Sequence, residues 1–360
     1  MQATLWDYII VGAGSAGCLV ANRLSACGTK RVLLLEAGGR DHSPLIKIPA
    51  AGARVAGLDG RASRYDWGYH CEPDPTRHNK VDHWARGRVV GGSSSINGMM
   101  YVRGSVVDYD RWAATGNHGW SAKDVMPLFQ SLERSDKNSD GKAESGRGHN
   151  GPLYVRTVKA CHPTTQAFIE AAQQAGYVHN PDYNGASQEG VGYAQLTQRG
   201  GRRWSAADAF LKPALKRPNL QLIVNACVHK MITSKGSVRG VRYKQGGILK
   251  EAHAKDVILC GGAINTPRLL MLSGIGDADT LSAHGIEVVK NLPSVGKNLI
   301  EHPMINMTYR VTQPTYNPTA GITQYLQFLM NYLFKNQGPI ATSFEAIGFL
   351  KTLPTLEDPD

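Results

Sequence analysis

Residues 6–36 read WDYIIVGAGSAGCLVANRLSACGTKRVLLLE, and this stretch decides the fold. Residues 6–11 and 31–36 are continuous apolar runs, which are typical of strands buried in a parallel sheet. Between them, residues 15–26 are rich in alanine and leucine and predict a helix. The order of strand, glycine turn, helix and strand predicts a βαβ unit and therefore an α/β fold.

The turn between the first predicted strand and the helix has the pattern GxGxxG, formed by Gly12, Gly14 and Gly17. In such a turn the first glycine permits a tight bend, the second lets the backbone approach a pyrophosphate, and the third lets the helix pack closely on the strand. The helix would begin at Ser15 and Ala16 and present free N–H groups to the phosphates. The pattern predicts a dinucleotide site, and a glycine turn without a ligand is the alternative.

Glu36 ends the second predicted strand. An acidic side chain about twenty residues after the glycines accepts hydrogen bonds from ribose hydroxyls in dinucleotide sites. A carboxylate at this position would repel the 2′-phosphate of NADP, so NADP is not expected. The βαβ unit alone does not distinguish FAD from NAD.

The bulk composition is that of a globular protein with an ordinary core. The 360 residues predict two domains at about 150 residues each. The six cysteines form no CxxC pair, and several lie in apolar runs, which favours a reducing, cytoplasmic location. The net charge of +11 is scattered without a basic run, so we expect a basic surface and no nucleic-acid partner.

We expect neither a signal peptide nor a membrane-spanning helix from the sequence. The first predicted strand begins almost at the N-terminus, which leaves no room for a signal peptide. Residues 322–334 are apolar but too short to cross a bilayer. They predict a buried helix, and a peripheral contact with a membrane surface is the alternative.

Further elements follow from local signals. Helices are expected at residues 121–132 with Ser121 as N-cap, at 164–176 with Gly176 as its stop, and at 266–272 opened by Pro267. Strands are expected at residues 220–226 and 256–260, and a hairpin is expected from residues 229–233 and 239–244 around Lys235 and Gly236. Residues 135–151 are polar and glycine-rich and predict a surface loop.

Two later segments distinguish FAD from NAD. Residues 87–110 read GRVVGGSSSINGMMYVRGSVVDYD, and residues 262–276 read GAINTPRLLMLSGIG. Together with the opening segment, they resemble the signatures of the glucose–methanol–choline (GMC) oxidoreductase family, to which choline dehydrogenases and related alcohol dehydrogenases belong. Residues 200–211 and 295–303 are also similar to family segments, so the resemblance covers essentially the whole chain in the family's order.

The resemblance implies a Rossmann-like FAD-binding domain and an α+β substrate or cap domain. We assign residues 1–155 and 215–303 to the FAD-binding domain. Residues 156–214 and 304–360 form part of the substrate domain, which we expect to be truncated at its C-terminus.

The resemblance also implies which residues line FAD. Backbone groups would make most of the contacts with the flavin. The main chain of Val228, in a predicted strand, would contact the adenine. A glycine–serine loop with an Asx turn, and a core valine, are the structural alternatives. Besides the residues of the βαβ unit, the implied set is Val89, Gly91, Gly92, Asn97, Gly98, Met99, Met100 and Val228.

Three positions refine this expectation. Some family members carry, just before the asparagine, a histidine that is tethered to the flavin, but this chain has Ile96, so non-covalent FAD is expected. Gly261 and Gly262 follow a predicted strand and would let the backbone approach the dinucleotide.

The implied reaction is oxidation of the CH–OH group of a primary alcohol. A hydride would pass from the substrate carbon to the flavin N5, and the electrons to a non-oxygen acceptor such as a quinone or a cytochrome. The family's general base is a histidine near the C-terminus, and no histidine here matches that motif, so no catalytic residue is assigned. His302 is expected to have a structural or cofactor-shell role. The alternatives are a catalytically dead FAD-binding fragment and an NAD-dependent dehydrogenase.

Residues 343–349, SFEAIGF, resemble a family strand that borders the substrate cavity. The glutamate of this segment, Glu345, would face the cationic head group if the substrate were choline. Trp67 and Tyr69 would line the same cavity or lie in the core. No histidine or cysteine cluster has metal-ligand spacing, so no metal is expected.

Overall fold

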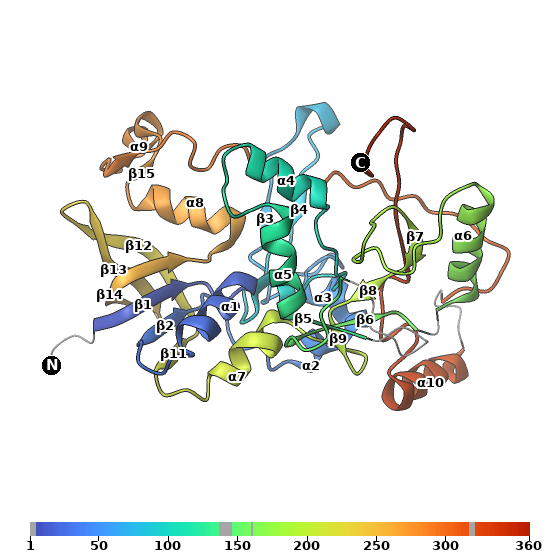
Figure 1. Cartoon of the computed structure of the whole chain (residues 1–360). Helices are drawn as coiled ribbons and strands as arrows, with labels where there is room; N and C mark the ends of the chain where they lie inside the picture. Colours follow the sequence, from blue (N-terminus) through green and yellow to red (C-terminus); the bar gives the residue numbers. More distant parts are fainter. Residues whose placement is uncertain (1–4, 137–145, 160, 317–320) are drawn as a thin grey trace. The chain divides into compact units, whose positions relative to one another are not determined.

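The structure is a computed structural model that describes residues 5–136, 146–159, 161–316 and 321–360. The chain folds into two compact units, each built from three separate stretches of sequence (Figure 1). Unit 1 comprises Met1–Ser43, Ala53–Ile96 and Ser205–Tyr309, and unit 2 comprises Pro44–Gly52, Asn97–Trp204 and Arg310–Asp360. The two units are described separately.

Unit 1 is built on a six-stranded sheet in the order β11-β2-β1-β14-β13-β12. Strands β11, β2, β1 and β14 run parallel, and β13 is antiparallel to both β14 and β12. The strands are β1 (Leu5–Val11), β2 (Val32–Leu35), β11 (Leu220–Ile223), β12 (Ala226–Ser234), β13 (Ser237–Gln245) and β14 (Ile248–Leu259). The parallel part of this sheet confirms the predicted α/β class.

The remaining elements of unit 1 are helices and two short strand pairs. Helix α1 (Ser15–Leu24) connects β1 to β2, and α8 (Gly262–Leu272) follows β14 (Figure 1). The others are η2 (Pro75–Arg77), η3 (Gly92–Ser95), the π-helix η4 (Ala207–Leu211), α7 (Lys212–Ala214), α9 (Ala278–Ala283), the antiparallel pair β3 (Tyr69–His70) and β4 (His83–Trp84), and the parallel pair β15 (Ile275–Gly276) and β16 (Lys290–Asn291).

The core of unit 1 explains why the apolar runs form strands. Ile9 and Val11 of β1 and Leu33 and Leu35 of β2 are buried together in one cluster with residues of β12, β13, β14 and α8. Strands covered on both faces need apolar side chains at consecutive positions, which is the pattern of both runs. The βαβ unit is therefore confirmed, with α1 ending two residues before the predicted boundary.

Two elements of unit 1 differ from the predictions. Strand β14 is much longer than residues 256–260, because its first half pairs with β13 in a hairpin while its second half pairs with β1. Helix α8 begins at Gly262 and not at residue 266, so Pro267 lies inside the helix. A proline inside a helix removes one hydrogen bond and crowds the preceding turn. Pro267 is therefore a cost that this helix tolerates and does not mark its start.

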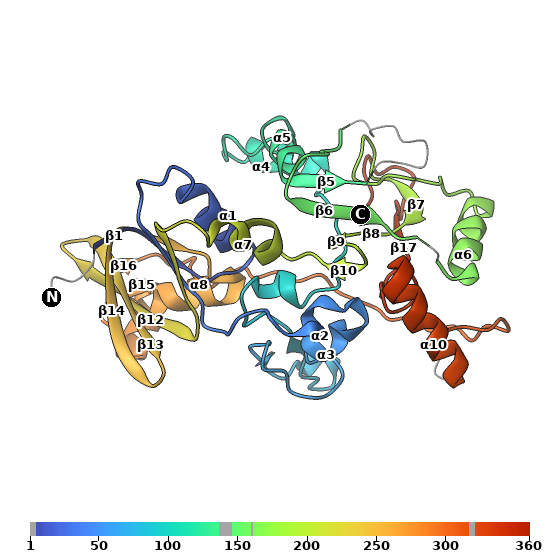
Figure 2. The same ribbon diagram turned by 90° about the horizontal axis from the view of Figure 1, so that it is seen from below.

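In the part of unit 2 that the structure describes there are small sheets and four helices of nine or more residues. Its strands are β5 (Glu133–Ser135), β6 (Leu153–Thr157) and β8 (Gln195–Leu196) in one sheet (Figure 2), the antiparallel pair β7 (Gly190–Tyr193) and β17 (Ala346–Phe349), and the hairpin of β9 (Gln198–Arg199) and β10 (Arg202–Arg203). Its helices are α2 (Pro44–Lys47), η1 (Pro49–Ala51), α4 (Val106–Ala114), α5 (Ala122–Leu132), α6 (Pro163–Gln174), α10 (Ile322–Met330) and the π-helix η5 (Asn331–Lys335). Helix α3 (Gly52–Val55) begins in unit 2 and ends in unit 1.

A buried ionic cluster stabilises the centre of unit 2. The carboxylate of Glu133 is fully buried and accepts hydrogen bonds from Arg103 Nη2 (2.5 Å), Arg147 Nε (2.9 Å) and the Gly148 N–H (2.7 Å). Arg147 also donates to Asp182 Oδ1. Charges this deeply buried are tolerated only when they are paired, so removal of one partner would leave an uncompensated buried charge and destabilise unit 2.

The units differ from the predicted domains. Residues 97–155 pack in unit 2 because β5 and β6 form a sheet with β8. Residues 205–214 pack in unit 1, where the Phe210 carbonyl accepts a hydrogen bond from Asn22 Nδ2 (2.8 Å) of α1. Sequence motifs mark ligand contacts, whereas these boundaries follow strand pairing, which the motifs do not report.

Three further predictions have mixed outcomes. The capped helix after Ser121 is confirmed, since Ser121 and Asp124 form a reciprocal capping box. The prediction of a buried helix at residues 322–334 is wrong, because most apolar side chains of α10 and η5 are exposed. The Phe328 ring of α10 contacts the Tyr316 ring edge to face. The predicted loop at residues 135–151 lies largely outside the described residues.

Candidate functional site: a glycine-walled cavity in unit 1

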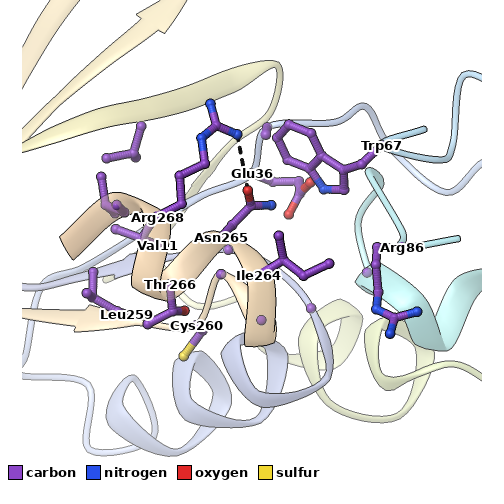
Figure 3. A pocket seen from close by; sticks show the side chains of 18 of the residues that line it. Val11, Glu36, Trp67, Arg86, Leu259, Cys260, Ile264, Asn265, Thr266 and Arg268 are labelled. Carbon is purple, nitrogen blue, oxygen red and sulfur yellow. Dashed lines mark hydrogen bonds between the residues drawn. The ribbon is translucent and has the colours of Figure 1, made fainter. Parts of the chain in front are cut away.

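Unit 1 contains a cavity of about 540 Å³ at the carboxyl ends of its central parallel strands. Its lining includes Val11, Leu35 and Leu259, which are the last residues of β1, β2 and β14. Figure 3 labels Val11 and Leu259 among the lining residues. In open parallel sheets the loops at this edge diverge and leave a crevice in which ligands bind. The cavity is large enough for part of a dinucleotide.

The three motif glycines have different structural roles. Gly12 has φ +101°, and a Cβ atom there would lie 2.5 Å from the Cys260 carbonyl oxygen. A Cβ atom at Gly17 would lie 1.9 Å from the Gly12 carbonyl oxygen, so helix α1 touches the turn through bare backbone. Gly14 lines the cavity, and a Cβ atom there would meet nothing closer than 3.9 Å. Gly12 and Gly17 therefore shape the turn, and Gly14 leaves space for a ligand.

A second glycine segment lines the cavity next to the first. Gly92, in η3, has φ +55° and lines the cavity. A Cβ atom at Gly92 would lie 2.7 Å from the Gly14 Cα, so the two glycine segments are in direct backbone contact. The close approach requires that Gly92 lack a side chain, whereas a Cβ atom at Gly14 would lie 3.9 Å from the Gly92 Cα, at ordinary contact distance.

Two helices begin at the cavity. Ser15 and Ala16 at the start of α1 line it, and so do residues 261–266 at the start of α8. These starts are adjacent because β1 and β14 are parallel neighbours that end at the same edge of the sheet. Free N–H groups and helix dipoles at such ends favour an anion such as a pyrophosphate.

Glu36 provides the negative charge of the site. Its Oε2 accepts the Ala13 N–H (2.9 Å), and its Oε1 accepts the Gly38 N–H (2.8 Å). Burial raises the pKa of Glu36 to about 7, and the hydrogen bonds from Gly38 and Ala13 partly oppose this rise. A carboxylate has capacity for about four hydrogen bonds, so it can accept further donors from a ligand.

The rim of the cavity is polar and aromatic. Asn265 Oδ1 accepts hydrogen bonds from the Tyr69 hydroxyl (2.6 Å) and from Arg268 Nη1 (3.3 Å), the second of which Figure 3 shows. The rings of Trp67 and Tyr69 stack with centroids 5.9 Å apart. Val228 of β12 also lines the cavity. Trp67 and Tyr69 thus lie beside this cavity in unit 1 and not in a core.

The predicted site residues fall into three groups. Seven line the cavity: Gly12, Gly14, Ser15, Ala16, Glu36, Gly92 and Val228. Three belong to unit 1 outside the lining: Gly17, Val89 and Gly91. The remaining five belong to unit 2: Asn97, Gly98, Met99, Met100 and Glu345.

In unit 2, the segment predicted to line the flavin has a well-defined local structure. Asn97 and Gly98 are exposed, whereas Met99 is buried. Asn97 Oδ1 accepts the Met99 N–H (3.1 Å), which is an Asx turn as the structural alternative proposed. An Asx turn that leaves the segment exposed is compatible with a role in ligand binding.

Glu345 already has partners within unit 2. Its Oε2 accepts the backbone N–H of His162 (2.8 Å) and the Thr165 hydroxyl (2.6 Å), both at the start of α6. The same region is aromatic, since the rings of His162 and Tyr316 meet edge to face with centroids 4.6 Å apart. Glu345 therefore stabilises a helix N-terminus next to aromatic rings.

Several lining residues were not predicted as ligand contacts. They include Arg86, Gly87, Ser93, Ala226, Cys227 and most of residues 259–272 apart from Gly261 and Gly262. A signal for the last group was present, because the strand, glycine pair and helix around Gly261 and Gly262 repeat the order seen around Gly12. Two parallel strands followed by such turns are expected to share one binding edge.

Glu301 and His302 lie in the segment of unit 1 that follows β16. The Glu301 carboxylate accepts a hydrogen bond from Arg86, and this hydrogen bond lowers the pKa of Glu301. His302 is exposed, outside the lining of the cavity. The hydrogen bond between Arg86 and Glu301 connects the segment after β16 to a residue that lines the cavity.

The cavity fits the ADP part of a dinucleotide. It combines a glycine wall, two helix N-termini, the buried carboxylate of Glu36 and an apolar strand residue, Val228. Ile96, buried in unit 1, has no group that could bond covalently to a flavin. Within the described ranges, no cluster of three histidine, cysteine or acidic side chains is suited to a metal ion. No helix in those ranges combines the length and apolar character that a bilayer crossing needs.

Comparisons with known proteins identify the chain's relatives. The model of the family described as GMC oxidoreductase matches residues 6–304. A protein named oxygen-dependent choline dehydrogenase from Rhizobium rhizogenes is 43% identical over 367 residues, which cover 100% of this chain and 64% of that protein. The protein of the same name from Sinorhizobium fredii is 43% identical over 363 residues, with the same two coverages. The chain thus spans about two thirds of the length of these curated relatives.

Solved structures show the same similarity. An FAD-dependent oxidoreductase from Chaetomium thermophilum matches 96% of this chain and 61% of its own, with a TM-score of 0.87 and 27% identity. Pyridoxine 4-oxidase from Mesorbium loti matches 80% of this chain and 56% of its own, with a TM-score of 0.74 and 36% identity.

Proposed function

Because the chain belongs to the GMC oxidoreductase family, we propose that it binds FAD non-covalently and contributes the cofactor-binding part of an alcohol oxidoreductase. The observation that carries this proposal is the glycine-walled cavity with Glu36 at the carboxyl edge of the parallel sheet. The matching family model covers most of the chain.

The ADP part of FAD would occupy the cavity of unit 1. In this proposal the pyrophosphate lies at the starts of α1 and α8, beside Gly14, and Glu36 accepts hydrogen bonds from the adenosine ribose. The adenine lies along the main chain at Val228. Residues 97–100 meet the flavin ring, and Val89, Gly91 and Gly92 support the approach of the chain to it. The support is the geometry of the cavity for the first part and the family resemblance for the second.

The pH dependence of FAD binding tests the role of Glu36. Ribose hydroxyls that donate to the carboxylate stabilise its charged form and lower its pKa, so binding releases a proton. Since the pKa of Glu36 without FAD is about 7, FAD affinity should rise from about pH 5 to about pH 7, by at most about tenfold per pH unit, and then level off. The measurement is a series of FAD titrations followed by fluorescence quenching.

Glu36→Gln provides the matched control for this prediction. The amide keeps the shape of the side chain but does not titrate, so its FAD affinity should be flat over the same pH range. An affinity that falls with rising pH, or an equal slope in both proteins, would contradict the assignment of Glu36 to the ribose.

The chemistry that FAD supplies when bound is acceptance of a hydride from the substrate carbon at N5. The described residues contribute binding and orientation: the cavity holds the adenine dinucleotide end, and the exposed segment at Asn97 and Gly98 presents polar groups. No residue among the 360 is proposed as the general base.

The proposed substrate is a primary alcohol, and choline is the more specific alternative. Two observations favour choline. The relatives from Rhizobium rhizogenes and Sinorhizobium fredii carry choline dehydrogenase in their names. Glu345 places a carboxylate beside Tyr316, and a carboxylate near aromatic faces suits a trimethylammonium group.

The electron acceptor in this proposal is a non-oxygen molecule such as a quinone or cytochrome. The relatives' names say oxygen-dependent, which makes oxygen the alternative. A quinone would be reached at a membrane surface. The exposed apolar side chains of α10 support a peripheral contact of the chain with such a surface.

Reconstitution with FAD tests the proposed function. We expect the purified chain to become yellow with FAD and to show flavin absorption bands. Since none of the described residues is proposed as the general base, reduction by primary alcohols or choline under anaerobic conditions should be slower by about 10²–10⁴ than in an enzyme that has one. Alcohol oxidation at an ordinary enzymatic rate would show that these residues already contain the base. Binding of NAD without FAD would overturn the cofactor assignment, and FAD binding with no reduction at all would favour the dead-fragment alternative.

A further inference from the structure

Arg203 is a buried cation that reaches the segment at Asn97. It lies on β10 in unit 2 and is 1% exposed. Its Nε donates to the Ile46 carbonyl (2.9 Å), and its Nη1 donates to Asn97 Oδ1 (2.7 Å). A guanidinium is planar, always charged and able only to donate, so these hydrogen bonds fix the positions of the Ile46 and Asn97 acceptors.

The hydrogen bonds of Asn97 determine which way its amide faces. Oδ1 accepts from Arg203 Nη1 and also from the Met99 N–H. Both partners are donors, so the amide oxygen and not the nitrogen must face them. Because Asn97 is exposed, the other branch of the amide, Nδ2, presents N–H donors on the outer side.

The backbone next to Asn97 is held in an uncommon conformation. Met99 has φ +66° although it is not glycine, and its side chain is buried. Its carbonyl oxygen accepts hydrogen bonds from the Thr197 N–H (2.8 Å) and hydroxyl (3.2 Å). Such conformations persist only where several contacts determine them, and they cluster at ligand sites. The segment is therefore shaped before any ligand arrives.

We propose that Arg203 is a positioning residue that makes Asn97 a fixed hydrogen-bond donor to the flavin. This inference rests on the proposed function, in which residues 97–100 meet the flavin ring. The rim of that ring carries carbonyl oxygens and ring nitrogens that accept hydrogen bonds. An amide held with Nδ2 outward complements these acceptors, whereas the flipped amide would place an oxygen against them. Arg203 acts only through Asn97.

Three variants test the proposal. Arg203→Met removes both donors and keeps an apolar stem. Arg202→Met is the matched control, because Arg202 is the exposed neighbour on the same strand. Asn97→Asp keeps an oxygen facing Arg203 and Met99 but replaces the outward N–H donors by a second oxygen. Asn97→Asp therefore tests the outward N–H donors separately from the contact with Arg203. Its result does not depend on whether Arg203→Met folds well.

The first measurement needs no cofactor. Hydrogen exchange of the peptide that contains the Met99 amide should be about tenfold faster in Arg203→Met, since loss of about 1.4 kcal/mol of hydrogen bonding changes an opening equilibrium tenfold. Asn97→Asp and Arg202→Met should exchange like the unaltered chain. Equal exchange in Arg203→Met and Arg202→Met would overturn the claim that Arg203 fixes the segment.

The second measurement uses the FAD-loaded chain. Arg203→Met and Asn97→Asp should each weaken FAD binding about tenfold, the effect of one lost hydrogen bond, while Arg202→Met should not. Asn97→Asp should also lower the flavin midpoint potential, because a carboxylate opposes the electron density gained on reduction. Unchanged FAD affinity and potential in Asn97→Asp would overturn the donor role. Failure of the unaltered chain to bind FAD would overturn the proposed function, and the exchange result would still decide whether Arg203 orients Asn97.

Discussion

Replacing Gly17 by alanine is expected to destabilise unit 1 by about 3 kcal/mol, near the upper end of the usual range for overpacking. The new Cβ atom would lie 1.9 Å from the Gly12 carbonyl oxygen and 3.1 Å from the Gly12 carbonyl carbon. Both are backbone atoms of the turn that begins α1, and backbone cannot move aside as a flexible side chain can. Alanine normally favours a helix over glycine by about 1 kcal/mol, so the sign of the effect is diagnostic.

Thermal unfolding followed by circular dichroism measures this effect. At about 2–4 °C per kcal/mol for a unit of this size, the midpoint should fall by about 6–12 °C. Gly39→Ala is the control, because Gly39 lies in unit 1 outside the cavity lining and a Cβ atom there would meet only Asn225 Oδ1, at 3.7 Å. A midpoint for Gly17→Ala equal to that of the control would refute the close packing of α1 on the turn.

Replacing Gly14 by alanine is expected to weaken FAD binding by about 10–100-fold while the fold is retained. A methyl group on Gly14 meets no protein atom closer than 3.9 Å and requires no left-handed backbone. It would project into the cavity where the pyrophosphate is proposed to lie. A clash of about 1–3 kcal/mol with a ligand corresponds to that loss of affinity.

The contrast between two alanine substitutions three residues apart makes this prediction specific. Gly14→Ala should unfold at the same temperature as the unaltered chain, whereas its FAD dissociation constant should rise. Fluorescence titration with FAD gives the affinity, and Gly39→Ala again serves as the control. An unchanged dissociation constant in Gly14→Ala would remove Gly14 from the cofactor site.

Much of unit 1 could be predicted because its signals are local. The apolar runs of β1 and β2 and the glycine pattern between them each depend on neighbouring residues only. The hairpin of β12 and β13 was likewise predicted from the turn at Lys235 and Gly236, which both have the positive φ that this turn requires. Glu36 was found because its distance from the glycines is set by the length of one helix and one strand.

The remainder depends on contacts between residues far apart in sequence. The start of α8 joins the cavity only because β14 pairs with β1, and the paired residues, such as Leu5 and His253, are 248 positions apart in the chain. Glu345 was predicted as a substrate contact from its motif, but the structure adds its hydrogen bonds to the start of α6. The burial of Arg203 and its contact with Asn97, 106 residues apart, follow from a hairpin that no sequence period reveals.

The central claim is that the cavity of unit 1 holds the ADP part of FAD. Competition between ADP and FAD tests it most directly, with calorimetric titration of FAD into the 360-residue chain in the presence and absence of ADP. The account predicts saturable binding of one FAD per chain, weakened in proportion to the ADP concentration, with the competition lost in Gly14→Ala. Saturable FAD binding that ADP does not affect, or no FAD binding at all, would contradict it.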